Sequence, residues 1–157
     1  MGTKYQGTAD EIRALNLFIK LTRASHSVAT YINGLIASYG LTESQFGTLE
    51  ALYHLGPMCQ GDIAAKVLRS SGNMTTVIDN LLRDGFVSKR RDPNDRRQVI
   101  VSLTDKGRAL IDEVFPHHVG AIVERLNVLT PEEQDTLAAL CKKLGTTQEE
   151  PPDELDD

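Results

Sequence analysis

The sequence predicts a mainly α-helical fold with one small β-hairpin, and three observations support this. Apolar residues recur at helical spacing through most of the 157 residues. Two short apolar runs, Phe86–Ser88 and Val99–Leu103, flank a basic loop with the turn-forming sequence Asp92-Pro93-Asn94-Asp95 at its tip. Finally, two short amphipathic segments directly precede this hairpin.

The N-terminal part predicts one long helix and one shorter helix. Apolar residues continue at near-helical spacing from Asp10 to Tyr39, and Gly40 ends this segment. Thr42 begins the next helix, which ends at His54-Leu55-Gly56-Pro57. Its inward-facing residues are expected to be Phe46, Leu49, Leu52 and Tyr53.

Two short helices are predicted next. Cys59–Leu68 has an apolar stripe, and after a break Met74–Leu82 has another. Ser70 or Ser71 can cap the second helix, and Gly85 can close it. Two short helices across a tight turn, followed by a basic hairpin, describe a winged helix-turn-helix.

The C-terminal part predicts two more helices. Thr104 caps a helix that runs to about Leu126, and Pro116 is expected to kink it or divide it into two pieces. Thr130-Pro131-Glu132-Glu133 is typical of a helix start, and Gly145 ends that helix. Residues 146–157 are acidic and contain prolines, which indicates a solvated tail.

The charge is polarised along the chain although the total is −5. Residues 56–108 contain ten basic and six acidic residues, a net charge of +4, whereas the remainder has seven basic and sixteen acidic residues, −9. A basic segment of this kind can face DNA while the acidic remainder limits non-specific binding.

The hairpin and the second short helix are the candidate DNA-binding elements. Several arginines cannot be buried together, so the hairpin either is a solvated surface feature or lies on phosphates and enters a groove. The helix carries short polar side chains on its non-core side, which either read bases and phosphates or only cap and solvate the helix. These polar residues are Ser71, Asn73, Thr75, Thr76 and Asn80.

Five motifs between Gly56 and Gly107 resemble those of the multiple antibiotic resistance regulator (MarR) family of winged-helix repressors. The Asp-x-Arg of the hairpin, followed by a β run and Leu-Thr-x-x-Gly, is the most specific part. The motifs are Asp62-Ile63-Ala64, Val77-Ile78-Asp79-Asn80-Leu81, Asp84-Gly85-Phe86-Val87, Asp92-Pro93-Asn94-Asp95-Arg96-Arg97 and Val101-Ser102-Leu103-Thr104-Asp105-Lys106-Gly107.

The resemblance implies a role for each site residue. Arg97 matches the wing-tip arginine that enters the minor groove, and Asp95 matches the acid that orients it. Phosphate contacts are expected from Arg96, Lys89, Arg90 and Arg91. The candidates for the recognition helix are Ser70, Ser71, Asn73, Thr75 and Thr76. Thr76 departs from the family, where a basic residue is frequent at this point.

We expect one domain, residues 1–145, that forms a homodimer. Residues 8–40 and 105–145 have more apolar surface than the winged helix-turn-helix of residues 41–104 can cover, which favours an oligomer interface. The resemblance implies a two-fold dimer with interlocked terminal helices. Such a dimer requires a roughly palindromic operator on double-stranded DNA.

Regulation by a small molecule is a further implication, because the family commonly binds small aromatic or phenolic anions beside its dimerisation helices. The residues that can line such a crevice are Arg23, His26, Tyr31, Phe46, His54 and His117. Each of these also suits a core or interface role. An alternative is thiol-based sensing of electrophiles or quinones through Cys59, at a helix start, with Cys141 as the other thiol.

Other classes of function are disfavoured. The sequence contains no glycine-rich phosphate loop, no Gly-x-Ser-x-Gly and no paired metal ligands, so we expect neither an enzyme nor a metal site or cofactor. A DNA-binding architectural protein without an effector remains a second alternative. The polar N-terminus and the lack of a long apolar run predict a cytoplasmic, nucleoid-associated protein of a bacterium or archaeon, without membrane contact.

Overall fold

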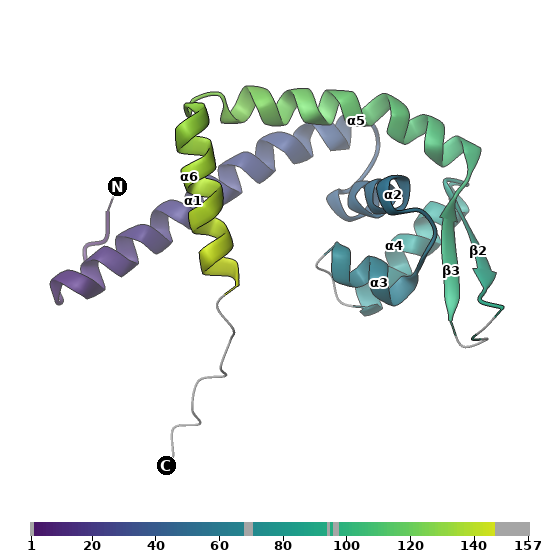
Figure 1. The fold of residues 1–157 in the computed structure, drawn as a ribbon, viewed down its shortest axis with the longest axis horizontal. Coiled ribbons are helices and arrows are strands. Elements are labelled where there is room, and N and C mark those ends of the chain that lie inside the picture. Colours follow the sequence, from purple (N-terminus) through teal and green to yellow (C-terminus); the bar gives the residue numbers. More distant parts are fainter. Residues whose placement is uncertain (1, 68–70, 94, 96–97, 147–157) are drawn as a thin grey trace, which may run out of the picture. The chain divides into compact units, whose positions relative to one another are not determined.

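The computed structural model describes residues 2–67, 71–93, 95 and 98–146, with only the backbone described at Ser71 and Gly72. These residues form six helices and three short strands (Figure 1), which confirms the mainly helical class with a small β element. Their contacts divide the chain into two compact units, Met1–Ile122 and Val123–Asp157. No helix in the described part of the chain is both long enough and apolar enough to cross a bilayer.

Helices α1 (Ala9–Ser38) and α2 (Glu43–Leu55) begin at threonine caps. The hydroxyls of Thr8 and Thr42 each accept a hydrogen bond from the backbone three residues later, and both threonines start complete capping boxes. Between the helices, Gly40 adopts a φ of 74°, which other residues avoid. Both helices therefore lie within a residue or so of their predicted bounds.

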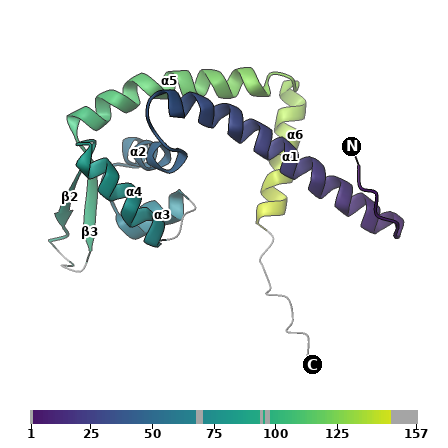
Figure 2. The ribbon, with the colours of Figure 1, turned by 180° about the vertical axis from the view of Figure 1, so that it is seen from behind.

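Helices α3 (Gln60–Lys66) and α4 (Ser71–Arg83) form the helix-turn-helix pair, and Figure 2 shows them from behind. Their bounds correct the predicted Cys59–Leu68 and Met74–Leu82. The first helix is shorter, because Cys59 belongs to a strand and Val67 to a turn. The second helix is longer, mainly because it begins at Ser71. The break between them includes residues 68–70, which lie outside the described residues.

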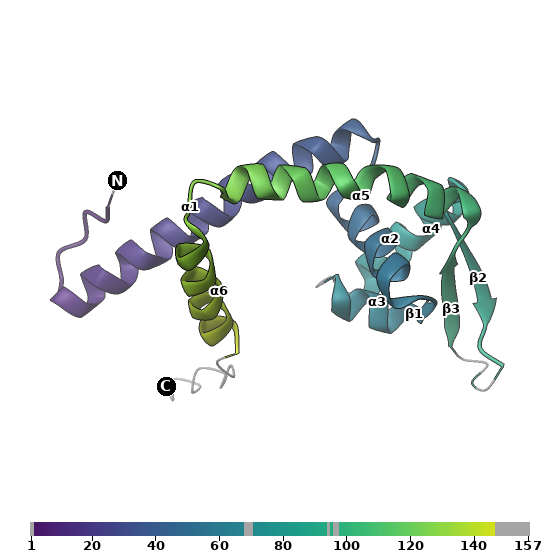
Figure 3. The ribbon, with the colours of Figure 1, turned by 45° about the horizontal axis from the view of Figure 1, so that its top comes forward.

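The sheet contains one strand more than the sequence predicts. Strands β1 (Met58–Cys59), β2 (Val87–Arg91) and β3 (Val99–Leu103) form an antiparallel sheet in the order β1-β3-β2. Cys59 pairs with Ile100, so it belongs to a strand rather than to the predicted helix. The hairpin β2-β3 is confirmed, but β2 continues past the predicted Ser88 because all five of its residues pair with β3. In Figure 3 the hairpin lies beside the α3–α4 pair.

One hydrophobic core joins these elements. It is built from buried apolar side chains of every helix in the first unit and from one residue in each strand of the hairpin. Its members are Ile32, Ile36, Leu41, Phe46, Leu49, Leu52, Ile63, Ala64, Met74, Ile78, Leu81, Val87, Val101, Ile111 and Val114. The predicted stripe of α4 therefore faces inward and leaves its polar residues outside.

Three segments meet where α4 ends and α5 (Asp105–Leu126) begins. The Thr104 hydroxyl donates to the Gly85 carbonyl at 2.7 Å, and the Thr104 amide donates to the Phe86 carbonyl at 3.0 Å. Lys106 Nζ donates to the Asp84 carbonyl at 2.7 Å and lies 4.6 Å from the centroid of the Phe86 ring. We call residues Asp84–Phe86 together with Thr104–Gly107 the junction.

Gly107 makes this close packing possible. A Cβ atom at this position would lie 2.0 Å from the Phe86 carbonyl oxygen, far inside van der Waals contact. Its amide donates to the Thr104 hydroxyl at 3.1 Å, which confirms Thr104 as the cap of α5. Pro116 does not divide the helix into two pieces, since α5 continues through it.

The second unit contains the last residues of α5 and helix α6 (Pro131–Gly145). The helix start predicted at Thr130 is confirmed, and Thr130 caps α6 with a complete capping box. Gln134 Nε2 donates to the Leu126 and Leu129 carbonyls and holds the connecting turn. On α6, Leu137, Leu140 and Leu144 are 45–58 % exposed at helical spacing. Of the predicted tail, only Thr146 lies within the described residues.

We predict that Gly107→Ala destabilises the protein by about 1–3 kcal/mol, because the new methyl group must displace backbone rather than a flexible side chain. The free energy of unfolding from urea titration measures this. Gly61→Ala is the matched control, since a Cβ at this helical position meets nothing within 4 Å. We expect the control to be neutral or stabilising by up to about 1 kcal/mol. Equal stability of Gly107→Ala and the parent would contradict the close packing.

Candidate nucleic-acid interface

Helix α4 has one apolar face and one polar face. Met74, Ile78 and Leu81 are fully buried, whereas Asn73, Thr75 and Thr76 are exposed on the outer side. Such short hydroxyl and amide side chains can donate to and accept from base edges without displacing the helix. The outer face of α4 thus has the chemistry of a recognition helix.

Thr75 is also tied to the neighbouring helix. Gln60 Nε2, at the start of α3, donates to Thr75 Oγ1 at 2.6 Å. Asn73 and Thr75 each make further interactions within the protein. The recognition face is therefore partly organised before any DNA is bound. Of the other DNA-binding residues predicted for this helix, Ser70 and the side chain of Ser71 lie outside the described residues.

The wing presents cations along β2. Arg90 and Arg91 are exposed and pair through their backbones with Ile100 and Val99 of β3. Lys89 differs, because its ammonium group forms an ion pair with Asp79 of α4 at 2.7 Å. The predicted phosphate contacts of Arg90 and Arg91 fit their exposure, whereas Lys89 is already engaged within the protein.

The described part of the wing tip is held by backbone hydrogen bonds. The Asp92 amide donates to the Gln98 carbonyl at 3.0 Å, and the Gln98 amide donates to the Asp95 carbonyl at 2.9 Å. Asp95 is half-buried and interacts with other groups. Arg96 and Arg97 lie outside the described residues, so their roles remain predictions.

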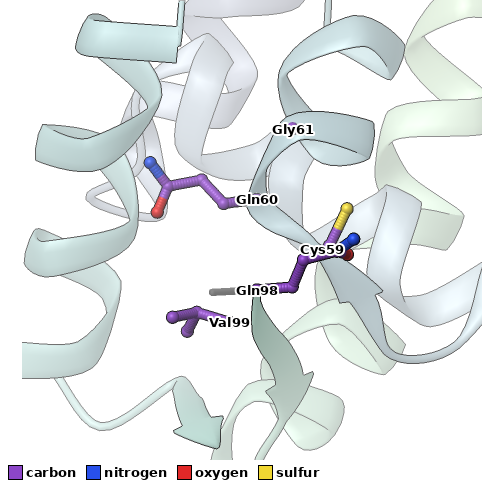
Figure 4. A pocket seen from close by; sticks show the side chains of 5 residues that line it. All are labelled: Cys59, Gln60, Gly61, Gln98 and Val99. Carbon is purple, nitrogen blue, oxygen red and sulfur yellow. The ribbon is translucent and has the colours of Figure 1, made fainter. Parts of the chain in front are cut away.

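A shallow pocket of about 380 Å³ lies between the start of α3 and the start of β3 (Figure 4). Cys59 contributes its half-buried side chain to this pocket and makes no side-chain cap to α3. The remaining lining residues are Gln60, Gly61, Gln98 and Val99. Cys141 is exposed on α6 and is also a free thiol.

The six residues proposed for an effector crevice are distributed over α1, α2 and α5. Arg23, His26 and Tyr31 are exposed on α1, and Arg23 lines a hollow of about 300 Å³ together with Phe18, Ile19, Thr22 and Gly2. His54 and His117 are exposed at the α2 and α5 surfaces. Phe46 is only 2 % exposed and belongs to the core, so its assignment to an open crevice is wrong.

Aromatic and histidine rings gather instead where α2 meets α5. His118 packs on Phe46 with ring centroids 4.5 Å apart, and His54 packs edge-on against Phe115 at 4.8 Å. His118 Nδ1 is buried without a hydrogen-bond partner among the described residues. Burial lowers the pKa of His118, and the nearby Glu50 carboxylate opposes part of this effect. Sequence reasoning missed His118, because its burial depends on a contact between distant helices.

On the other side of α5, His117 Nδ1 and the Tyr39 hydroxyl share a short hydrogen bond. The adjacent His117 and His118 therefore face different elements, as expected for consecutive helical residues. Within the described residues, no group of three His, Cys, Asp or Glu side chains has the placement needed to hold a metal ion.

A polar recognition helix beside a cationic two-stranded wing defines a winged helix-turn-helix DNA-binding regulator. The comparisons with known proteins agree: the MarR family model matches residues 41–99, which span α2 to the start of β3. The chain is 40 % identical to the uncharacterized HTH-type transcriptional regulator YkoM of Bacillus subtilis over 133 residues, 85 % of this chain and 86 % of YkoM. The protein belongs to the MarR family of DNA-binding transcriptional regulators, which are not enzymes.

Further similarities extend over most of the chain. The HTH-type transcriptional regulator MhqR of Bacillus subtilis is 35 % identical over 85 % of this chain and 92 % of its own length. A mutant MarR of Escherichia coli, solved with operator DNA, superposes with a TM-score of 0.75 at 26 % identity and covers 88 % of this chain and 99 % of its own. Bordetella bronchiseptica BpsR, whose DNA binding is regulated by 6-hydroxynicotinic acid, has a TM-score of 0.75 at 28 % identity and covers 82 % of this chain and 98 % of its own.

Proposed function

We propose that the protein is a ligand-responsive repressor that binds a palindromic operator as a homodimer. The observation that carries this proposal is the polar outer face of α4 beside the basic strand β2 in one folded unit. These two elements suit the major groove and the neighbouring minor groove of one half-site. The operator complex of the related MarR protein supports this mode of binding.

Apolar surface on the terminal helices supports the dimer. In α1, Leu17 and Phe18 are 61 % and 66 % exposed, and in the second unit Leu140 and Leu144 are 58 % and 57 % exposed. A protein that functions as a monomer rarely leaves so many large apolar side chains in water. A second copy of the chain covers these faces and places two recognition helices on one duplex, which requires an operator with two-fold symmetry.

The wing tip supplies the groove contact in this proposal. Arg97 enters the minor groove, Asp95 orients it, and Arg90, Arg91 and Arg96 contact phosphates. The base-reading side chains are Ser71, Asn73 and Thr76, and Ser70 and Thr75 add further DNA contacts from the turn and recognition helix. Because arginine is absent from this set, hydroxyl and amide groups read the major groove.

We predict that Arg97→Ala weakens operator binding by about 1–3 kcal/mol, roughly 5- to 150-fold, without a change in folding. Fluorescence anisotropy at fixed salt measures this on the palindromic fragment upstream of the protein's own gene and on a scrambled fragment. Arg13→Ala is the control, because Arg13 pairs locally with Asp10 on α1 at 2.6 Å. Parent-like binding by Arg97→Ala would contradict the wing assignment, and equal affinity for both fragments would favour the architectural alternative.

The effector in this proposal is a small aromatic carboxylate or phenol. Regulation of BpsR by 6-hydroxynicotinic acid supports this class, since that acid combines an aromatic ring with a carboxylate. On α1, Arg23 and the exposed Phe18 both line one hollow, which offers a cation and an apolar wall. His26, Tyr31, His54 and His117 add further donors at the surface of the first unit.

We predict that 6-hydroxynicotinate or salicylate lowers operator affinity by about five- to 150-fold, which corresponds to 1–3 kcal/mol of coupling. The ligand binds more tightly to the dimer conformation in which the spacing of the two winged helices does not fit the operator. Titration into the operator complex measures the effect on the parent, on Arg23→Ala and on the double variant Cys59→Ser, Cys141→Ser. We expect Arg23→Ala to respond less and the double variant to respond fully. Loss of the response in the double variant would establish thiol sensing instead.

A further inference from the structure

An ion pair between Asp79 and Lys89 links the recognition helix to the wing. Asp79 lies on α4 and Lys89 on β2, and their charged atoms are 2.7 Å apart. The Lys89 side chain is 27 % exposed and the Asp79 side chain 59 %. The pair is therefore partly shielded from water, which strengthens it relative to a fully exposed ion pair.

The strand geometry explains why Lys89 meets α4. Side chains alternate along a strand, so Lys89 lies on the same face of β2 as Val87, which is buried in the core. Its direct neighbour on β3 is Val101, which is also fully buried. The aliphatic stem of Lys89 thus continues the packed face of the wing, and its ammonium group reaches the carboxylate of Asp79.

Asp79 occupies an unfavourable place for a DNA-binding protein. It lies three and four residues after Thr76 and Thr75, one helical turn beyond them on the same side of α4. A carboxylate there repels the phosphates of a duplex that contacts Thr75 and Thr76. The cost of this repulsion must be offset by another contribution of Asp79 to DNA binding. The ion pair with Lys89 provides such a contribution.

We propose that Asp79 and Lys89 are positioning residues that fix the wing against the recognition helix. This rests on the proposed function, in which α4 and the wing contact one half-site together. The ion pair sets the distance between the two elements before DNA binds, so less ordering is needed in the complex. Lys89 therefore acts through Asp79 and not as the phosphate contact predicted from the sequence.

The two possible roles of Lys89 predict opposite changes in operator affinity for Asp79→Asn. If Lys89 only contacts phosphate, removing the acid strengthens DNA binding, because a repulsive charge disappears and Lys89 is released. If the pair positions the wing, Asp79→Asn weakens operator binding by about fivefold for each winged helix on the DNA. We expect the same loss for Lys89→Gln, and no additional loss in the double variant Asp79→Asn, Lys89→Gln.

Operator binding by fluorescence anisotropy at fixed salt tests this on the full-length protein, with thermal unfolding to verify each fold. The charge swap Asp79→Lys, Lys89→Asp should bind the operator more tightly than either single charge change, Asp79→Lys or Lys89→Asp, because only the swap restores the ion pair. Arg83→Gln is the matched control, because it breaks the ion pair of Arg83 with the adjacent Asp84 (3.2 Å) and leaves the wing attached. We expect this control to bind within twofold of the parent, about 0.4 kcal/mol.

Tighter operator binding by Asp79→Asn, or additive losses in the double variant without rescue by the charge swap, would overturn the positioning role. These outcomes differ from failure of the proposed function, which appears in the parent itself as equal affinity for the palindromic and the scrambled fragment. A parent that prefers the palindrome and an Asp79→Asn variant that loses affinity together support the inference.

Discussion

The contact between Gly107 and the Phe86 carbonyl is the constraint on which the winged helix depends. Only a glycine allows the start of α5 to approach this backbone, since a Cβ would lie 2.0 Å from the carbonyl oxygen. Thr104 adds two hydrogen bonds to the same turn, one from its hydroxyl and one from its amide. The end of the recognition helix, the start of the wing and the start of α5 are thereby held at one point. The resemblance motifs Asp84-Gly85-Phe86-Val87 and Leu103-Thr104-Asp105-Lys106-Gly107 are the two sides of this junction.

The junction also bears on the proposed ligand response, because it joins α5 to the recognition helix. Because the start of α5 packs directly on the Phe86 backbone, a displacement of this end of α5 would move the end of the recognition helix with it. The core reinforces the connection, because Leu81 of α4, Val101 of β3 and Ile111 of α5 are all fully buried in it. In the proposed dimer, a ligand that changed the spacing of the two winged helices would act on packed units, as a switch between two states requires.

The sequence was most informative where a local interaction defines an element. The sequence predicts Thr104 as a helix cap and Thr42 and Thr130 as helix starts, because a cap is determined by a side chain and the backbone a few residues away. The two-residue strand β1 was missed, since it has no periodicity and exists only through pairing with the distant β3.

In the candidate site, too, local features follow from the sequence, whereas features that depend on distant contacts do not. The polar face of α4 and the basic wing follow from composition and spacing, and the structure places both on one unit. The engagement of Lys89 with Asp79 and the burial of Phe46 depend on tertiary contacts, which spacing alone does not reveal. A row of basic residues in a sequence therefore identifies a surface that favours DNA but does not show which cations are available to it.

The junction joins α4, the wing and α5 into one cooperative unit, and native-state hydrogen exchange tests this cooperativity most directly. The informative amides are those of Asp84, bonded to Asn80 of α4, Phe86, bonded to Leu81, and Thr104, bonded to Phe86. We predict that all three exchange with the same free energy of opening, within about 0.5 kcal/mol, and that this value equals that of global unfolding. A Thr104 amide that opens at a free energy lower by about 2 kcal/mol or more than that of Asp84 would contradict this cooperativity, because the wing and α5 would then separate from the recognition helix independently.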